Sequence, residues 1–497
     1  MSTVAAPRSA PLWRLYPRAI DRLLRVTGWQ WVLVFILAWY VWHFTNTTVR
    51  MHHGLGTSAY DFALYDQGMW LLSRFKAPFV TLMGRNLFGD HTSFIMIFLV
   101  PFYWLFPGPG ILLFFQSVGL AAGAIPVFLY ARRRLESEPI AVVLAGAFLL
   151  HPAISRTNVE QFHPDAFLPA LVGFAIYFAL TGRWRAYSVF VVLALLVKED
   201  AALVIIPLGI WVALRRDRRT GIITVVGALL YAAFAMGVVI NLLNGEWAPN
   251  AWRIPFGGVG GLISAAFTRP GEVISYLVSD GRPWYLFQAA FPFAFLFLLT
   301  PTLAAISAPA LGANVISAFS YQYDIRYHYT AVGLPALSLA SVEAIGRTPR
   351  EWRGSLAAIM LSFSLLGAFW WGSFPMSFDP KTYWSPHDPI AQEAAEIFPL
   401  IPDDAVIAVY HNLSPHLAHR EQVYMFPNPF STTLYGDAEL RRNEGQRLPM
   451  ADDVEFVMLP PQFSVRDGYL VWEAVRGDFE LVIANDHWQL WQRRSPH

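Results

Sequence analysis

The sequence predicts an all-α polytopic membrane domain followed by a small C-terminal α/β domain. Of the 497 residues, 55% are hydrophobic and only 14% are charged, whereas soluble proteins carry about 25% charged residues. Long apolar runs recur between residues 28 and 374 and then stop. From residue 375 onward the chain holds 18 acidic and 9 basic residues and only short apolar runs. We therefore expect a transmembrane domain at 28–374 and a soluble domain at 375–497.

The segment 1–27 carries five arginines and no pattern of a cleaved signal peptide. We expect it to be a basic cytoplasmic N-terminus, followed by a retained membrane span. A span needs roughly 20 apolar residues, and fewer when a helix is broken or lies inside a bundle. Eleven runs are predicted to cross: Gly28–Phe44, Gly110–Ala131, Ile140–Leu150, Ala166–Thr181, Tyr187–Val197, Ala201–Leu214, Ile222–Leu243, Trp284–Thr300, Leu303–Ser320, Thr330–Ile345 and Ser355–Phe374.

The orientation follows from the basic residues, because lysines and arginines of short loops stay cytoplasmic. All basic clusters fall on one side only if Ser93–Phe106 does not cross. This run has 14 residues and contains Pro101, which suits a helix lying in the interface. The N-terminus is then inside and the C-terminal domain extracytoplasmic. The basic clusters lie at 8–25, 132–134, 183–185, 215–219 and 347–353.

The first outer loop, 45–92, carries carboxylates and histidines among aromatic residues. Asp61 and Tyr65 follow helical i, i+4 spacing, and Asp66 belongs to a second series of this kind. A short amphipathic helix on the membrane surface would aim these side chains at the bilayer. Ser58-x-x-Asp61 is also a capping-box pattern, in which Asp61 only satisfies the start of a helix.

Lys198-Glu199-Asp200 is expected at the tip of a helical hairpin. The run before it, Tyr187–Val197, spans about 17 Å as a helix, which is too short for a membrane core of roughly 30 Å. These charges should therefore lie in a cavity below the outer surface, where charged residues are usually functional. The alternative is a structural triad that neutralises itself.

Two further outer motifs contain histidines next to acids, Asp90-His91 and His163-Pro164-Asp165. His91, His163 and Asp165 are candidates for orienting a substrate or binding a divalent metal such as Mg or Mn. The alternative is that Asp90 and Asp165 only stabilise the starts of the following helices.

The last outer motif, 321–329, contains Arg326 and Tyr327 among several tyrosines. Arg326 and Lys198 are the candidates for binding a phosphate. Alternatively, Arg326 pairs with Asp324 or stacks on an aromatic ring.

Two segments outside the spans have distinctive compositions. The outer loop 244–283 is rich in Gly and Pro, which indicates a mobile lid or a flexible connector. In the tail, β-like runs occur at Ala405–Tyr410, Val423–Phe426, Val454–Leu459, Phe479–Ala484 and Trp488–Gln492, with helix-compatible segments at Pro389–Ile397, Ser414–Arg420 and Gly468–Arg476.

Composition also excludes some classes of function. The net charge of +1 gives no footprint for nucleic acid. The chain has no cysteine, so disulfides, thiolate nucleophiles and cysteine-ligated metals are excluded.

A charged outer cavity in a membrane protein suits the transfer of a sugar from a lipid phosphate to a hydroxyl group. This reaction needs a carboxylate that takes the proton of the acceptor, cations or a metal at the phosphate, and an apolar groove for the lipid. Asp61 is the first candidate for the base and Asp66 the second. The candidate substrate-binding residues are Tyr65, His91, His163, Asp165, Lys198, Glu199, Asp200, Arg326 and Tyr327.

At Tyr60-Asp61-x-x-x-Tyr65 and Val159 to Asp165 the chain resembles a family of predicted bacterial integral membrane proteins of unknown function. That family is itself similar to the C-type-fold (GT-C) glycosyltransferases, such as protein O-mannosyltransferases and aminoarabinose transferases. The resemblance covers roughly residues 28–350. It implies a bacterial cytoplasmic membrane protein with a juxtamembrane helix at Ser93–Phe106, Asp61 as catalytic acid/base and Asp165 as a substrate- or metal-site residue.

Our first hypothesis is an inverting glycosyltransferase that lies in the lipid bilayer, takes its sugar from a polyprenyl-phosphate donor and passes it to a glycan, lipid or protein of the cell envelope. The alternatives are a transporter or flippase of a lipid-linked or anionic substrate, and a cell-envelope scaffold. A transporter is expected to show inverted repeats and polar groups on the cytoplasmic side, which the sequence does not show.

Overall fold

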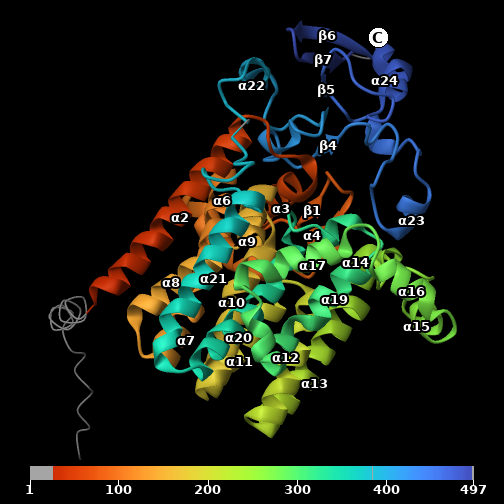
Figure 1. Ribbon diagram of the computed structural model, residues 1–497. Coiled ribbons are helices and arrows are strands. Elements are labelled where there is room, and N and C mark those ends of the chain that lie inside the picture. The colour runs from red at the N-terminus through yellow and green to blue at the C-terminus, as the bar shows by residue number, and fades with distance from the viewer. Residues whose placement is uncertain (1–25, 383, 495–497) are drawn as a thin grey trace, which may run out of the picture.

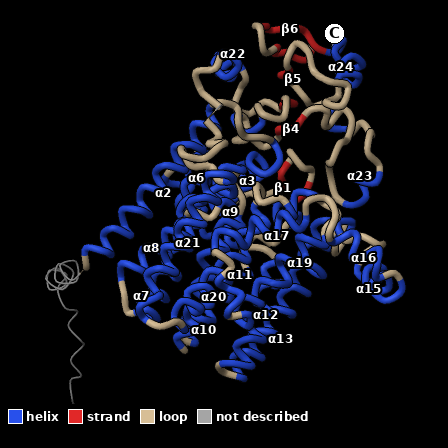
Figure 2. The backbone as a smooth tube through the Cα atoms, viewed as in Figure 1, coloured by secondary structure: helices blue, strands red, loops and turns tan. Residues whose placement is uncertain are grey.

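Helices form the lower part of the molecule, and a small sheet with short helices stands above them (Figure 1). The computed structural model describes residues 26–382 and 384–494. The strands lie almost entirely in the upper part (Figure 2). The predicted N-terminal segment 1–27 falls almost wholly outside the described residues.

Six helical segments of the described residues are long and apolar enough to cross a membrane, and the bent pair α8 (Glu138–Leu149) and α9 (Pro152–Glu160) makes a seventh. The six are α2 (Gly28–His53), α6 with α7 (Pro109–Ala122, Ala124–Leu135), η4 with α10 (Pro164–Phe167, Leu168–Thr181), α13 to α14 (Arg218–Phe234, Asn241–Asn244), η12 with α20 (His328–Gly333, Leu334–Arg347) and α21 (Arg350–Trp371).

The other four predicted spans are shorter or broken helices. For example, α11 (Trp184–Leu195) has 12 residues, about 18 Å. The chain between α17 (Arg282–Ala290) and α18 (Pro301–Ala304) forms only the short turns η8 (Phe291–Phe293) and η9 (Leu296–Leu299). The total of eleven spans therefore stays a prediction. The remaining bundle helices are α12 (Ala202–Arg215) and α19 (Ala308–Ile316).

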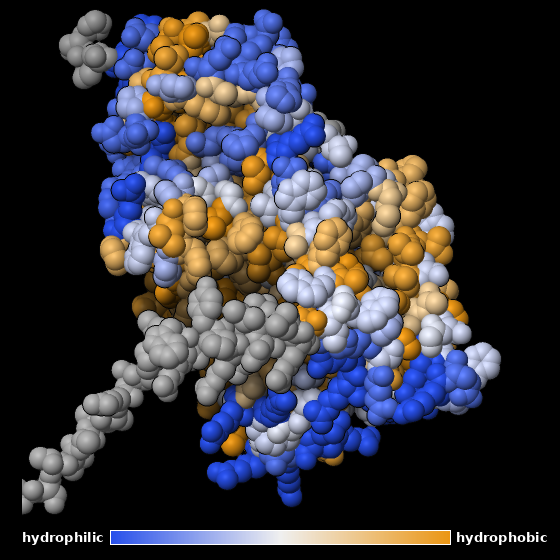
Figure 3. Space-filling model, turned by 90° about the vertical axis from the view of Figure 1, so that its left-hand side faces the viewer, coloured by the Kyte–Doolittle hydropathy of each residue, from blue (hydrophilic) through white to orange (hydrophobic). Residues whose placement is uncertain are grey.

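The bundle is organised around α20, which is mostly buried, whereas α2 and α13 are apolar but mostly exposed. Neighbouring helices pack as pairs, α7 along α8, α10 along α11 and α12 along α13. On the face in Figure 3, apolar side chains cross the middle and hydrophilic ones predominate above and below. An apolar exterior of this kind is expected where helices face lipid.

The first loop, between α2 and α6, is folded rather than extended. The run Ser93–Phe106, which was predicted not to cross, forms the short helices η3 and α5. The elements of the loop are η2 (Ala59–Ala63), α3 (Leu64–Ser73), β1 (Phe79–Val80), β2 (Arg85–Asn86), α4 (Leu87–Asp90), η3 (Phe94–Leu99) and α5 (Val100–Leu105).

The tail forms a five-stranded mixed sheet, so all five predicted strands are confirmed. The order is β4-β3-β5-β7-β6, with β3 parallel to β4 and β5, and β7 antiparallel to β5 and β6. The predicted helix at Ser414–Arg420 is only the short turn η14 (Ser414–His416). The elements are α22 (Pro389–Ile397), β3 (Ile407–Val409), β4 (Val423–Met425), α23 (Ala438–Arg442), β5 (Phe456–Leu459), α24 (Tyr469–Val475), β6 (Phe479–Ala484) and β7 (Gln489–Arg493).

The sheet domain packs on the first loop. Apolar residues of both, such as Phe62 and Trp488, belong to one buried cluster. Thr81 of the loop donates to the carbonyl of Val423 in β4 at 2.9 Å, and the hydroxyl of Tyr60 donates to the carbonyl of Leu434 at 2.6 Å. The two parts of the chain, more than 300 residues apart, therefore hold each other in place.

The segment 244–283, predicted from its composition as a mobile or flexible outer loop, is partly helical. It contains the helices α15 (Val259–Thr268) and α16 (Pro270–Leu277), which form a hairpin. The glycines and prolines lie mainly at the helix starts, where Pro fits the first turn.

Candidate functional site

A polar cavity of about 180 Å³ lies where the first loop meets the ends of several bundle helices. Its walls come from five separate parts of the chain, and most of them carry charged or aromatic side chains. The lining residues are Tyr60, Asp61, Leu64, Tyr65, Arg85, Asp90, His91, His163, Lys198, Asn250, Arg253, His328 and Tyr329.

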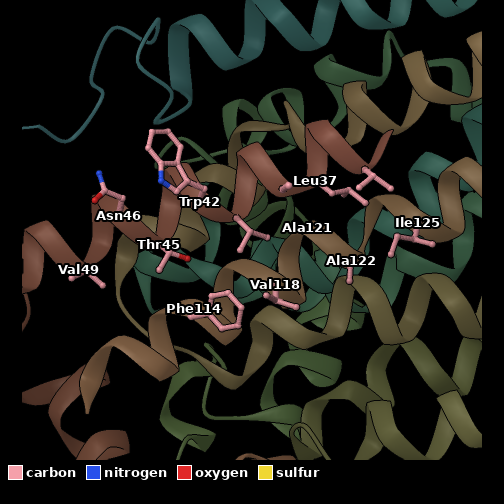
Figure 4. A pocket seen from close by; sticks show the side chains of 13 residues that line it. Leu37, Trp42, Thr45, Asn46, Val49, Phe114, Val118, Ala121, Ala122 and Ile125 are labelled. Atoms are coloured by element: carbon pink, nitrogen blue, oxygen red, sulfur yellow. The ribbon is translucent and has the colours of Figure 1, made fainter. Parts of the chain in front are cut away.

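A larger groove of about 820 Å³ lies between α2 and α6–α7 (Figure 4). Its lining includes Leu37, Trp42, Phe114 and Val118 and is almost wholly apolar. A groove without acids, bases or histidines cannot perform proton transfer, so we place the candidate site in the smaller polar cavity.

Asp61 stands at the cavity on a strained turn. Its φ of 73° and ψ of −52° lie close to the γ-turn of positive φ, which is rare and strained. Because the backbone of Tyr60 and Asp61 within η2 is not helical and α3 begins at Leu64, the predicted helix carrying Asp61 and Tyr65 together is not formed. The capping box is also not formed, since Ser58 donates its hydroxyl to the carbonyl of Tyr60 at 2.8 Å. Strained residues of this kind concentrate at active sites.

Asp66 does not line the cavity, in contrast to the prediction that it could replace Asp61 as base. It is fully buried and accepts a hydrogen bond from Tyr103 at 2.7 Å, and its other oxygen lies 3.0 Å from Nε2 of His419 in the tail. Asp66 therefore ties the first loop to the sheet domain.

Lys198 is buried in the cavity wall between two carboxylates. Its Nζ lies 3.6 Å from Oδ1 of Asp165 and 3.6 Å from Oδ2 of Asp200. Burial alone would lower the pKa of Lys198, but Asp165 and Asp200 raise it well above its usual value. The ammonium group thus stays charged, as an anion-binding role requires.

Glu199 turns away from Lys198, so the three-residue motif does not simply neutralise itself. It lies 2.7 Å from Nδ1 of His91 and accepts from the backbone N–H of Thr92 at 3.1 Å. Burial would raise the pKa of Glu199, but His91 and Lys198 lower it to about 2. The charged Glu199 thereby orients the His91 ring at the cavity.

Asp90 ends α4 and forms an ion pair with Arg85 at 2.5 Å instead of capping the next helix. Burial would raise the pKa of Asp90, but Arg85 and His91 hold it well below the usual range. This pair closes the side of the cavity next to the tail, where Arg85 also donates to the carbonyl of Gly436 at 3.2 Å.

Arg253 is a site residue that the sequence reasoning missed. Its guanidinium lies 4.7 Å from the ring centre of Phe319 and 6.0 Å from that of Tyr329. Among the described residues no carboxylate pairs with it, and its Nε is buried without a hydrogen-bond partner. The only sequence signal was a basic residue in a predicted outer loop.

Arg326 and Tyr327 do not line the cavity, so the structure does not bring them together with the other predicted substrate-binding residues. Arg326 is exposed and pairs with Asp324 at 2.6 Å, the alternative that the sequence left open. Tyr327 stacks on Tyr321 with ring centres 4.3 Å apart.

Glu160, His163 and His328 offer a group of metal-ligand atoms that all lie within 4.8 Å of one another. The rings of His163 and His328 stack at 3.8 Å, and Nδ1 of His328 lies 3.2 Å from Oε1 of Glu160. The predicted metal candidates His91 and Asp165 are not in this group. Two imidazoles and one carboxylate suit Zn or Fe better than the predicted Mg or Mn.

His163 also faces the candidate base. Its Nε2 lies 3.5 Å from Oδ1 of Asp61, and within the described residues its Nδ1 has no hydrogen-bond partner. Burial would lower the pKa of His163, but Glu160 and Asp61 raise it to about 9. The buried Nδ1 of His163 without a partner suits a metal ligand. The protonated ring of His163 instead suits pairing with an anion.

The fold and the cavity define a polytopic helical membrane protein with a polar site at the helix ends and a small sheet domain above it. The family model for a predicted membrane protein, DUF2079, matches residues 51–464, and the chain belongs to this family. The predicted resemblance is thereby confirmed. The comparison with curated proteins gives no match.

Two similar solved structures are those of ArnT from Cupriavidus metallidurans, a GT-C glycosyltransferase. The structure with bound undecaprenyl phosphate is 12% identical with a TM-score of 0.52, and the alignment covers 94% of this chain and 98% of that one. The apo structure is 13% identical with a TM-score of 0.52, over 93% and 97% of the two chains. At this identity the likeness shows the fold, which is the predicted GT-C-like fold.

Proposed function

We propose that this protein is a membrane glycosyltransferase that moves a sugar from a polyprenyl-phosphate donor to an acceptor outside the cytoplasmic membrane. The observation that carries the proposal is the polar cavity, which places the strained Asp61 beside buried cations. The GT-C-like fold supports it, because ArnT with this fold binds undecaprenyl phosphate.

Asp61 is the proposed general base. The acceptor hydroxyl attacks the anomeric carbon and gives its proton to a carboxylate oxygen of Asp61, while the bond from that carbon to the phosphate oxygen breaks. Polyprenyl phosphate leaves, and attack from the opposite side inverts the anomeric centre. The carboxylate of Asp61 is half exposed at the cavity, so it can contact a substrate and accept the proton of the acceptor hydroxyl.

Lys198 and Arg253 are proposed to hold the phosphate, and its negative charge grows as the sugar bond breaks. Lys198 is a charge fixed by Asp165 and Asp200, and Arg253 has donors that no carboxylate of the described residues takes up. Cations that are already in position stabilise developing charge without reorganising. If a divalent ion binds at Glu160, His163 and His328, it adds positive charge to the same wall.

The outer location is part of the proposal. The arginine-rich ends of α7 and α13 and the sheet domain lie at opposite ends of the bundle (Figure 1). Since arginines stay cytoplasmic, the cavity and the sheet domain then face outward.

The test is the release of undecaprenyl phosphate from a panel of undecaprenyl-phosphate sugars by membranes that contain the protein. We expect Asp61→Asn to lower the release about 100-fold, the usual range for the loss of a general base, while expression and thermal stability stay unchanged. The matched control is Asp324→Asn, whose carboxylate pairs with Arg326 outside the cavity and which should stay active. Full activity of Asp61→Asn would refute the role of this residue.

A further inference from the structure

The hairpin of α15 and α16 exposes a continuous apolar face. Val259, Ile263 and Phe267 are four residues apart on α15 and are exposed by 58, 55 and 85%, and Ile274 on α16 is exposed by 61%. Ala265 is the one buried residue of α15, and α16 has none. The hairpin therefore presents large apolar side chains that no other part of the described chain covers.

The hairpin leaves the bundle sideways, below the sheet domain (Figure 1). It follows the candidate span that ends at Asn244 and precedes α17. Both neighbours expose apolar side chains, Leu242 before the hairpin and Trp284 after it. The apolar face of the hairpin is thus continuous with surfaces that face lipid.

Polar residues of the hairpin and aromatic residues just before it are arranged as at a membrane–water interface. Arg269 and Glu272 pair with each other at 2.9 Å where the two helices join, and both are exposed. Trp247 and Trp252, in the chain that leads into the hairpin, are exposed as well. Tryptophans gather at the level of the lipid headgroups because their rings are apolar and their N–H group is polar.

We propose that the α15–α16 hairpin is an in-plane membrane anchor, with Val259, Ile263, Phe267 and Ile274 among the acyl chains of the bilayer. The occupant of the exposed face is lipid, because the lipid-facing surface continues on both sides of the hairpin. This inference does not depend on the glycosyl transfer proposed above.

The base of the hairpin is fastened to the cavity wall. Arg282 is buried between the rings of Tyr276 and Tyr323 and donates to the carbonyl of Val315 at 2.8 Å. The carbonyl of Arg253 accepts from the N–H of Ala318 at 2.7 Å. Tyr276 of α16 donates to the carbonyl of Ser317, next to Ala318, at 2.9 Å, so the base of the hairpin is linked to the cavity wall that Arg253 forms.

The absence of cysteine from the sequence makes this inference directly testable. A nitroxide is attached to single cysteines in Phe267→Cys, Ile274→Cys and Ser264→Cys of the full chain in phosphatidylcholine/phosphatidylglycerol vesicles. Leu242→Cys serves as the reference in lipid, and Ser464→Cys in the sheet domain as the reference in water. All five positions are exposed, so the substitutions remove few contacts.

We expect labels at 267 and 274 to collide with oxygen more often than with a water-soluble nickel complex, as at 242. The label at 264, beside the apolar face, should be more accessible to nickel than the label at 267. Nickel accessibility at 267 and 274 equal to that at 464 would overturn the proposal. Spin–spin broadening at 267 between labelled molecules would do so as well, because it would show that a second copy covers the face.

Discussion

Two arginines from predicted outer loops have opposite environments. Arg326 has a carboxylate partner, Asp324, and is exposed to water. Arg253 lies among aromatic rings at the cavity with a buried Nε that has no partner within the described residues. An unpaired guanidinium near a cavity is costly unless an anion binds it, so Arg253 is the stronger candidate for the phosphate.

Replacing Arg253 with Ala should weaken the binding of undecaprenyl phosphate by about 10- to 100-fold, since a hydrogen bond to a charged group contributes about 1.5–3 kcal/mol. Arg326→Ala, the matched control, should bind as the wild type does. A fluorescence titration in nanodiscs measures both affinities. Equal affinities for the two variants would exclude Arg253 from the phosphate site.

Lys198 pairs with two carboxylates, the buried Asp165 and the exposed Asp200. Lys198→Met should lower the free energy of unfolding by about 3–5 kcal/mol, because the buried carboxylate of Asp165 is left without its cation. Adding Asp165→Asn should restore part of the loss. Thermal unfolding in detergent provides the comparison, and a Lys198→Met protein as stable as the wild type would contradict the pairing.

Several side-chain contacts dock α2 and the first loop on the tail. Asp66 of α3 faces His419, and the rings of His52 at the end of α2 and His416 in η14 stack at 4.2 Å. Lys76 and Glu421 form a further ion pair. Acids and histidines that look catalytic in the sequence thus serve to dock one element on another.

The His416 contact predicts a loss of stability in acid. Burial, with a contribution from His53, lowers the pKa of His416 to about 4 from its usual 6.5. Because the folded state binds this proton less readily than the unfolded state, the contribution is complete above pH 6.5 and is lost as the pH falls towards 4. At pH 5 the loss amounts to about 2 kcal/mol.

His416→Phe should keep the stacking on His52 and Phe398 and remove this pH dependence. The unfolding midpoints of the variant and the wild type are measured at pH 8 and pH 5. The change between the two pH values is then compared between the two proteins, so that the opposite effect of His419, which both proteins contain, cancels. Parallel pH profiles for the two proteins would rule out His416 as the source.

The molecule as a whole has an arginine-rich end and an acidic end that carries the sheet. The ends of α7 and α12 hold Arg132–Arg134 and Arg215, whereas the tail holds an excess of acids. We propose the orientation that puts the arginines in the cytoplasm, and this orientation sets both the cavity and the sheet outside.

Single cysteines at the two ends test this orientation. Ser464→Cys in the sheet domain should react with a membrane-impermeant maleimide in spheroplasts, whereas Arg133→Cys at the opposite end should react only after permeabilisation. Both positions are exposed. The reverse labelling pattern would overturn the proposed outer site.

The sequence alone determined the class of the protein and the five strands of the tail, because hydrophobic runs and alternation are local properties. It also identified Asp61, Tyr65, His91, His163 and Lys198, all of which line the cavity. Their types and their predicted positions near helix ends were sufficient for that.

Only the tertiary structure separated Asp61 from Asp66 and Arg253 from Arg326, and only it brought Asp61 and His328 to His163. Each of these distinctions depends on which partner a charged group meets. In this fold the partners of Asp66, Arg253 and His163 come from segments far away along the chain. Local spacing contains no information about such contacts, since they are decided by how the helices, the first loop and the tail sheet pack.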